Sequence, residues 1–126
     1  MNLVDSSGWL EYFAGGANHD FFAPAVEDTP NLIVSVLNVY EVFKRILQQR
    51  DEGSALQAAA IMQQAQIIDL DSSISLSASK LGLESKLPMA DSIILATARR
   101  FNATLWTQDR DFAGLPNVRY RAKRGK

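Results

Sequence analysis

The alternation that decides the fold is clearest in residues 87–107, which read LPMADSIILATARRFNATLWT. Pro88 is well placed for the first turn of a helix, and the apolar side chains after it predict a helix from residue 89 to about residue 101. Residues 103–107 form a short apolar run that is typical of a buried strand. A helix followed at once by a strand is the repeating unit of an α/β sheet.

The same pattern extends to both sides of this stretch. Further strands are predicted at residues 2–4, 32–34 and 67–70, with a short fifth strand at 118–120. Further helices are predicted at about 9–14, 21–26, 36–49, 55–66 and 74–83. We therefore expect one α/β domain over residues 1–126, with a mostly parallel central sheet of four to five strands covered by helices on both faces.

The helix expected at 36–49 carries a narrow polar stripe on a largely apolar surface. The stripe consists of Asn38, Glu41, Arg45 and Gln48, which follow one another at helical spacing. We expect this helix to be mostly buried. Ser35 is placed to cap it, and Asp71 is placed to cap the helix expected at 74–83.

The composition is that of one ordinary globular domain, with 126 residues of which 47% are hydrophobic. The sequence has no cysteine, which excludes disulfides, cysteine-ligated zinc, iron–sulfur clusters and thiol nucleophiles. Its one histidine, His19, lies in a polar stretch and is assigned no function. The longest apolar runs fall far short of the ~18 residues that span a bilayer, and an acid stands where a signal peptide would carry positive charge. We expect a cytoplasmic protein with no membrane segment.

Charge is distributed unevenly, although the net charge is only −1. Eight basic and fourteen acidic residues precede position 119, so that part of the chain carries −6. The basic tail at about residues 119–126 carries +5, from Arg119, Arg121, Lys123, Arg124 and Lys126. Such a tail can bind anions, and the alternative interpretation is a frayed, solvated terminus.

Four carboxylates are expected near one edge of the sheet. Asp5 directly follows the first strand, and Asp109 lies two residues past the end of the fourth. Glu41 and Asp91 lie on helices, Asp91 within about the first turn. In an open parallel sheet, ligands bind beyond the carboxyl ends of the strands. Each acid alone also has a local interpretation, as a helix cap, a first-turn residue, an Asx turn or part of a solvated stripe.

These acids lie in four motifs that together resemble the PIN domain family, and most closely its VapC-type toxins of prokaryotic toxin–antitoxin pairs. The first motif is residues 5–7, DSS, after a strand, and the second is residues 35–41, SVLNVYE. The third and fourth are much more specific: residues 87–98, LPMADSIILATA, and residues 107–112, TQDRDF. The resemblance covers essentially the whole chain, from the first strand to residue 112 or beyond.

The resemblance implies a metal-dependent ribonuclease. The residues that match the family's acidic metal ligands, and would be catalytic, are Asp5, Glu41, Asp91 and Asp109. Ser6 and Thr107 match its small hydroxyl positions and would hold carboxylates by hydrogen bonds, while Asp111 would bind a second ion. Because close carboxylates repel one another unless a cation neutralises them, and all-oxygen ligands suit hard ions, the expected cofactor is Mg²⁺ or Mn²⁺.

The same resemblance implies three partners: an RNA substrate, an antitoxin protein that inserts a segment near the active site, and a second copy of the chain in a homodimer. Residues that would contact RNA are sought among the basic side chains. They are Arg99, Arg100, Arg110, Arg119, Arg121, Lys123 and Arg124.

Two other functions stay open. The first is a PIN-like module that binds RNA or a protein without catalysis. The second is a Mg²⁺-binding receiver-like signalling domain with Asp69 or Asp71 as phosphate acceptor, although such a domain needs paired acids after the first strand. A dehalogenase-like phosphatase would need an acid at position 7, where this sequence has serine.

Overall fold

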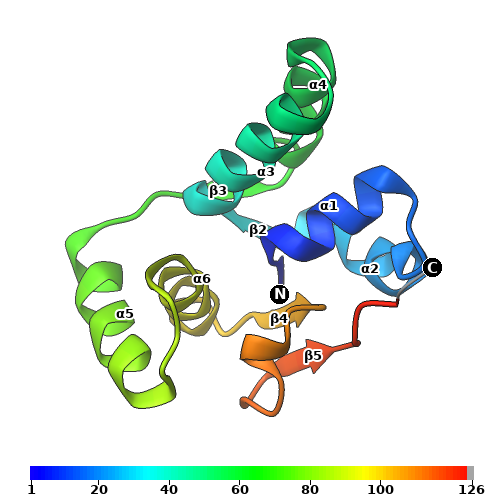
Figure 1. Cartoon of the computed structure of the whole chain (residues 1–126). Helices are drawn as coiled ribbons and strands as arrows, with labels where there is room; N and C mark the ends of the chain where they lie inside the picture. The colour runs from blue at the N-terminus through cyan, green and yellow to red at the C-terminus, as the bar shows by residue number, and fades with distance from the viewer. Residues whose placement is uncertain (125–126) are drawn as a thin grey trace.

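The computed structural model describes residues 1–124, so Lys126 of the basic tail lies outside the described residues. Helices and strands alternate along the chain (Figure 1). The strands are β1 (Asn2–Val4), β2 (Leu32–Ser35), β3 (Gln66–Ile68), β4 (Thr104–Thr107) and β5 (Val118–Tyr120). The helices are α1 (Ser6–Ala14), α2 (His19–Val26), α3 (Val36–Gln49), α4 (Glu52–Met62), α5 (Ser72–Ser85) and α6 (Met89–Arg100), with short 3-10 helices η1 (Thr29–Asn31) and η2 (Arg110–Phe112). Within residues 1–124, no helix is both long and apolar enough to cross a membrane.

The five strands form one sheet in the order β3-β2-β1-β4-β5, and all four neighbouring pairs are parallel. The predicted α/β fold with a parallel sheet is therefore confirmed. Since every strand runs the same way, every carboxyl end lies at the same edge of the sheet. The chain goes from β1 to β2 on one side and later returns to β4 on the other side, so the strand order reverses between β1 and β4.

Alternate residues of the strands contribute to two apolar layers, one on each face of the sheet. Leu3 and Ile33 belong to the layer that includes α5 and α6 residues, and Val4 and Val34 belong to the layer that includes residues of α1 to α4. Figure 1 shows α5 and α6 together on one side of the molecule. In α6 all seven residues from Ser92 to Ala98 are buried. The expected covering of both faces is confirmed.

Helix α3 begins and ends where the sequence predicts, but it is less buried than expected. Tyr40 is 61% exposed and Leu47 is 42% exposed. Asn38, which the stripe pattern groups with polar surface residues, is completely buried. The cause is that α3 turns only one stripe, Asn38, Val42 and Ile46, towards the sheet and α4 side of the molecule.

Helix α4 begins three residues earlier than predicted and ends before residue 66. The Asp51-Glu52-Gly53 segment suggested a break, but Asp51 is the N-cap of α4 and accepts a hydrogen bond from the Ser54 N–H at 2.7 Å. An aspartate cap followed by glycine in the first turn is compatible with a helix start. The predicted caps Ser35 and Asp71 are confirmed.

The start of the basic tail is packed against the body. The Arg121 N–H donates to the Thr107 carbonyl at 3.1 Å, and Asn18 Nδ2 donates to the Ala122 carbonyl at 3.0 Å. The Arg119 guanidinium lies 4.4 Å from the Trp106 ring centroid, and that of Arg121 lies 4.8 Å from the Phe21 ring. The frayed-terminus interpretation is therefore wrong for residues 119–122.

Gly8 allows α1 to approach the sheet closely. A Cβ atom at this position would lie 2.6 Å from both Phe22 Cε1 and Val4 Cγ1, which are buried. Such a distance is shorter than any normal contact, so a side chain here would push α1 away from β1. The approach matters because the Gly8 N–H also donates to the Asp5 carboxylate at 3.2 Å.

We expect Gly8→Ala to lower the free energy of unfolding by about 1–3 kcal/mol, because it overpacks a buried contact. Urea denaturation followed by circular dichroism measures this change. Gly53→Ala is the matched control, since Gly53 also lies in a first helical turn but is exposed, with only Asp51 Oδ1 near its Cβ position at 3.3 Å. An equal loss of stability in the two variants would contradict the close-packing interpretation.

Candidate active site

A cleft of about 320 Å³ lies where the ends of β1 and β4 meet the starts of α1, α3 and α6. Its lining includes Ser6 and Arg45 as well as the four predicted carboxylates, Asp5, Glu41, Asp91 and Asp109. These acids come from four separate places in the sequence: the residue after β1, α3, the first turn of α6 and the loop after β4. The cleft thus lies at the edge and at the strand-order reversal where a parallel sheet binds its ligands.

Asp5 is buried at the centre of this arrangement, with 3% of its surface exposed. It is the N-cap of α1, and its carboxylate accepts hydrogen bonds from Gly8 N at 3.2 Å, Ser7 Oγ at 2.8 Å and Thr107 Oγ1 at 3.0 Å. These donors favour the charged carboxylate. Burial opposes them more strongly and raises the pKa of Asp5 to about 7.

Thr107 connects the ends of the two central strands. Its hydroxyl donates to Asp5 Oδ2 and accepts the Asp109 N–H at 2.8 Å. Asp109 in turn accepts the Asp111 N–H at 2.9 Å, which fixes the turn that starts η2. The carboxylates of Asp5 and Asp109 are therefore placed by one shared hydroxyl group.

Glu41 is held by a chain of hydrogen bonds that begins inside the protein. Ser6 Oγ donates to Glu41 Oε1 at 2.6 Å, and Asn38 Nδ2 donates to Ser6 Oγ at 3.0 Å. The Asn38 Oδ1 atom accepts the Ser35 N–H at 3.2 Å, which completes a capping box at the start of α3. Because Asn38 donates to the Ser6 oxygen, the Ser6 proton is directed towards Glu41.

Asn38 is a site residue that the sequence interpretation missed. Its spacing of three residues after a serine cap, followed by Glu41 three residues later, is a signal that the sequence does contain. Arg45 was also missed as a residue of the cleft, although it lies four residues after Glu41 and therefore on the same face of α3.

Asp91 lies among other negative charges. One carboxylate oxygen from each of Asp91, Asp109 and Asp111 falls in a group whose members are within 4.8 Å of one another. Burial raises the pKa of Asp91 to about 7, and the nearby carboxylates of Asp109, Asp111 and Glu41 raise it further in the same direction. Asp5 and Glu41 line the cleft outside this group of three.

The donor atoms fit a hard divalent cation. The ionisable ligands of the cleft are carboxylates, and neither its lining nor the group of three contains a histidine among the described residues. Oxygen-only ligand sets suit Mg²⁺ and Mn²⁺ rather than zinc. A cation held by Asp91, Asp109 and Asp111 would also remove the repulsion that raises the Asp91 pKa.

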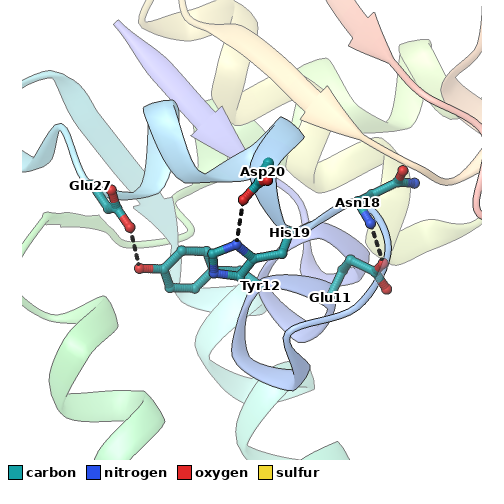
Figure 2. Close-up of polar contacts among 6 residues, drawn as sticks. All are labelled: Glu11, Tyr12, Asn18, His19, Asp20 and Glu27. Atoms are coloured by element: carbon teal, nitrogen blue, oxygen red, sulfur yellow. Dashed lines mark hydrogen bonds and ion pairs between the residues drawn. The ribbon is translucent and has the colours of Figure 1, made fainter.

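His19 lies away from this cleft, at the start of α2. Its ring stacks on Tyr12 at 4.6 Å between centroids, and its Nδ1 lies 3.1 Å from Asp20 Oδ1 (Figure 2). Tyr12 donates to Glu27 at 2.8 Å in the same view. These contacts join α1 to α2, in agreement with the absence of a function assigned to His19.

The predicted RNA-binding residues are dispersed. Arg99 and Arg100 lie in the last turn of α6, at the opposite end from Asp91, and Arg100 donates to Ser73 of the neighbouring region at 2.7 Å. Arg110 is exposed beside Asp109. The other four candidates belong to the C-terminal segment, which runs along the end of β4: Arg119, Arg121, Lys123 and Arg124.

Fold and site together define an α/β protein with a carboxylate centre at the strand-order reversal of a parallel sheet. The chain belongs to the PIN domain family, whose model matches residues 3–117. The predicted resemblance is thereby confirmed. No curated protein matches the sequence at a significant level.

Solved structures with the same fold include several toxins. A chain of a toxin–antitoxin complex from Klebsiella pneumoniae is 27% identical, with a TM-score of 0.79 over 94% of this chain and 96% of that chain. VapC20 of Mycobacterium tuberculosis, a sarcin–ricin loop cleaving toxin, is 18% identical, with a TM-score of 0.76 over 92% and 95%. DNA-bound VapBC from Salmonella typhimurium is 13% identical, with a TM-score of 0.75 over 97% and 98%.

Without a divalent ion, the free energy of unfolding should fall as the pH rises from about 4 to about 7. In the folded protein Asp5 and Asp91 have pKa values of about 7, whereas the unfolded chain releases these protons near pH 4. In this window the folded state therefore binds more protons, and its advantage is lost as the pH passes the folded pKa. Urea denaturation in EDTA at pH 5.0 and 7.5 measures the fall.

Asp91→Asn removes one of the two groups, so its stability should decline less between these pH values than that of the wild type. Asp69→Asn is the matched control, because Asp69 is exposed outside the cleft and should leave the decline unchanged. Parallel declines in the wild type and the Asp91 variant would contradict the raised pKa of Asp91.

Proposed function

We propose that the protein is a metal-dependent ribonuclease and the toxin of a type II toxin–antitoxin pair. The observation that carries the proposal is the convergence of Asp5, Glu41, Asp91 and Asp109 on one cleft in a chain of the PIN domain family. The 27% identical chain from a toxin–antitoxin complex supports the second part. An RNA substrate inside the cell also implies that the protein acts in the cytoplasm.

In this proposal the carboxylates hold the cation directly or through water, with Asp111 serving a second ion. A bound Mg²⁺ or Mn²⁺ supplies charge stabilisation at the phosphodiester and a water of lowered pKa. Ser6 and Thr107 keep the carboxylates of Glu41 and Asp5 in fixed rotamers through the hydrogen bonds described above. Glu41 or Asp91 orients the attacking water, so that no histidine or covalent nucleophile is needed.

The RNA would approach the cleft along the C-terminal segment and η2. Arg110, Arg119, Arg121, Lys123 and Arg124 lie on this side of the fold, where positive charge offsets the repulsion between phosphates and the acidic cleft. Two of the original candidates, Arg99 and Arg100, would contact only a longer RNA, because they lie at the far end of α6.

The proposed protein partners are an antitoxin and a second copy of the chain. Neighbouring structures contain toxin–antitoxin complexes, which supports the first partner. Exposed apolar side chains support a further protein contact: Leu76 is 70% exposed and Leu83 84% on α5, and Met89 is 76% exposed at the start of α6. Apolar groups of this size are typical of surfaces that another protein covers.

The two alternative functions have weaker support. Asp69 is exposed outside the cleft, and Asp71 is occupied as the N-cap of α5, so neither matches a phosphate-accepting residue of a receiver domain. A module that binds RNA without cutting it would retain the fold and lose the metal dependence. The tests below separate this module from the nuclease.

Mg²⁺ or Mn²⁺ should raise the melting temperature in a saturable way, because an ion that binds only the folded site stabilises it by mass action. EDTA should reverse the effect. Titration calorimetry near pH 7.5 measures the binding, and Asp91→Asn should weaken it because one ligand of the closest carboxylate group is lost. Absence of specific divalent binding in the wild type would rule out the metal-dependent nuclease.

Cleavage of RNA should fall at least about 100-fold in Glu41→Gln, Asp91→Asn and Asp109→Asn, because each loses a charged ligand or a proton-transfer group at nearly constant volume. Metal-free stability should hold or rise in Asp91→Asn, since its carboxylate is repelled by its neighbours. Asp69→Asn should cleave like the wild type. The readout is fluorescence from a labelled single-stranded RNA, with Mn²⁺ present or chelated.

Asp5→Asn should differ from these three variants by also losing stability, by about 1 kcal/mol, because its amide would face a donor that the carboxylate now accepts. Full cleavage by the Glu41 and Asp91 variants would show that the carboxylates are structural and would favour the non-catalytic module.

A further inference from the structure

A second cavity of about 370 Å³ adjoins the acidic cleft. The two share Ser7, Leu10, Arg45 and Asp109 in their linings, so they form one continuous depression. The volume of the second cavity lies within the range of clefts that hold small ligands or a single nucleotide unit. Its floor is polar rather than acidic alone.

Two basic side chains face each other across this depression, Arg45 of α3 and Lys123 of the C-terminal segment. Neither makes an ion pair within 4.0 Å among residues 1–124, although carboxylates line the same depression. Every other cation of the described chain is absent from the lining of both cavities. Arg45 and Lys123 are therefore positive groups whose charge is not used by the folded protein itself.

The position of Lys123 is fixed through the residue before it. Asn18 is completely buried, and its Nδ2 donates both to the Ala122 carbonyl at 3.0 Å and to Gln108 Oε1 at 3.0 Å. Figure 2 shows the Asn18 backbone N–H donating to Glu11 Oε2, at 2.8 Å. These bonds hold the segment against the loop that carries Asp109, so Lys123 begins at a defined point beside the cleft.

Arg45 is fixed on the opposite side by its helix. It lies one turn after Glu41 on the same face of α3, and Glu41 is held by Ser6. The distance between the acidic centre and each cation is thus set by rigid backbone on both sides of the depression.

We propose that Arg45 and Lys123 form a phosphate subsite that binds the phosphodiester group of single-stranded RNA next to the group held at the carboxylates. The inference rests on the proposed nuclease function and adds where the strand continues. A polyanion is repelled by the carboxylates at the scissile position, and two cations at the neighbouring phosphate offset that repulsion. An arginine fork and a lysine point charge are the usual side chains for such a group.

The test measures RNA binding apart from cleavage. A labelled single-stranded RNA is titrated in EDTA with Asp91→Asn protein as the common background, at 50 and 200 mM monovalent salt. Arg45→Gln/Lys123→Gln is compared with Lys44→Gln/Lys80→Gln, which removes the same charge from exposed positions outside both cavities. All four side chains are exposed, so melting temperatures should stay close to that of the background.

Each lost contact lowers the salt slope by ~0.7 for a single strand, so the Arg45/Lys123 variant should lose about sevenfold less affinity than the background across this fourfold change in salt. The Lys44/Lys80 variant should keep the background slope. Equal slopes in the two double variants would overturn the subsite, because the effect would then be that of net charge alone.

Cleavage kinetics in Mn²⁺ distinguish failure of the subsite from failure of the proposed function. With otherwise wild-type protein, Arg45→Gln/Lys123→Gln should raise KM and leave kcat near its starting value, as expected for a phosphate held equally in the ground and transition states. Unchanged KM with active wild-type enzyme overturns the subsite alone. A wild type that binds RNA with the predicted slope difference but never cleaves it overturns the nuclease and leaves the phosphate-binding site supported.

Discussion

Burial of the Asp5 carboxylate is the constraint on which the rest of the site depends. The carboxylate lies at the start of α1 and between the ends of β1 and β4, where it accepts three hydrogen bonds from Ser7, Gly8 and Thr107. Each donor comes from an element that also supports another part of the cleft. Thr107 holds the Asp109 backbone, and Gly8 lets α1 lie close enough to β1 for the contact to form. A change that moved any of these elements would therefore displace two acidic groups at once.

The local and the functional interpretations of the acidic residues hold together. Asp5 caps α1, Asp91 lies in the first turn of α6, and Asp109 closes the turn before η2. These are positions where the backbone presents free N–H groups to a carboxylate. The same backbone groups that stabilise helix starts also set the orientation of side chains that share a cleft. A capping role is thus no argument against a role in ligand binding in this fold.

Much of the fold could be predicted because its boundaries carry strong local signals. Ser35 and Asp71 mark helix starts, Pro88 precedes α6, and the short apolar runs match all five strands within about two residues. The start of α4 was wrong because an Asp-Glu-Gly segment suits both a break and a capped first turn. The acids could be placed at one edge because parallel strands end together.

What the sequence could not give is contact between distant polar residues. Periodicity groups Asn38 with the polar stripe of α3, yet Asn38 is completely buried because its partner, Ser6, lies 32 residues earlier in the chain. Arg45 and Lys123 meet at one cavity for a similar reason, since only the packing of the C-terminal segment on Asn18 brings them together.

The two ends of the chain also differ in how they can be extended. The Met1 carbonyl accepts the Thr104 N–H at the amino edge of the sheet, opposite the carboxylates, whereas Lys123 stands beside the cleft. A purification tag or fluorescent protein joined before Met1 leaves the molecule on the side remote from the acidic residues. The same addition at the other end would start within a few residues of the cavity and compete with whatever enters it, so fusions for binding assays belong at the amino end.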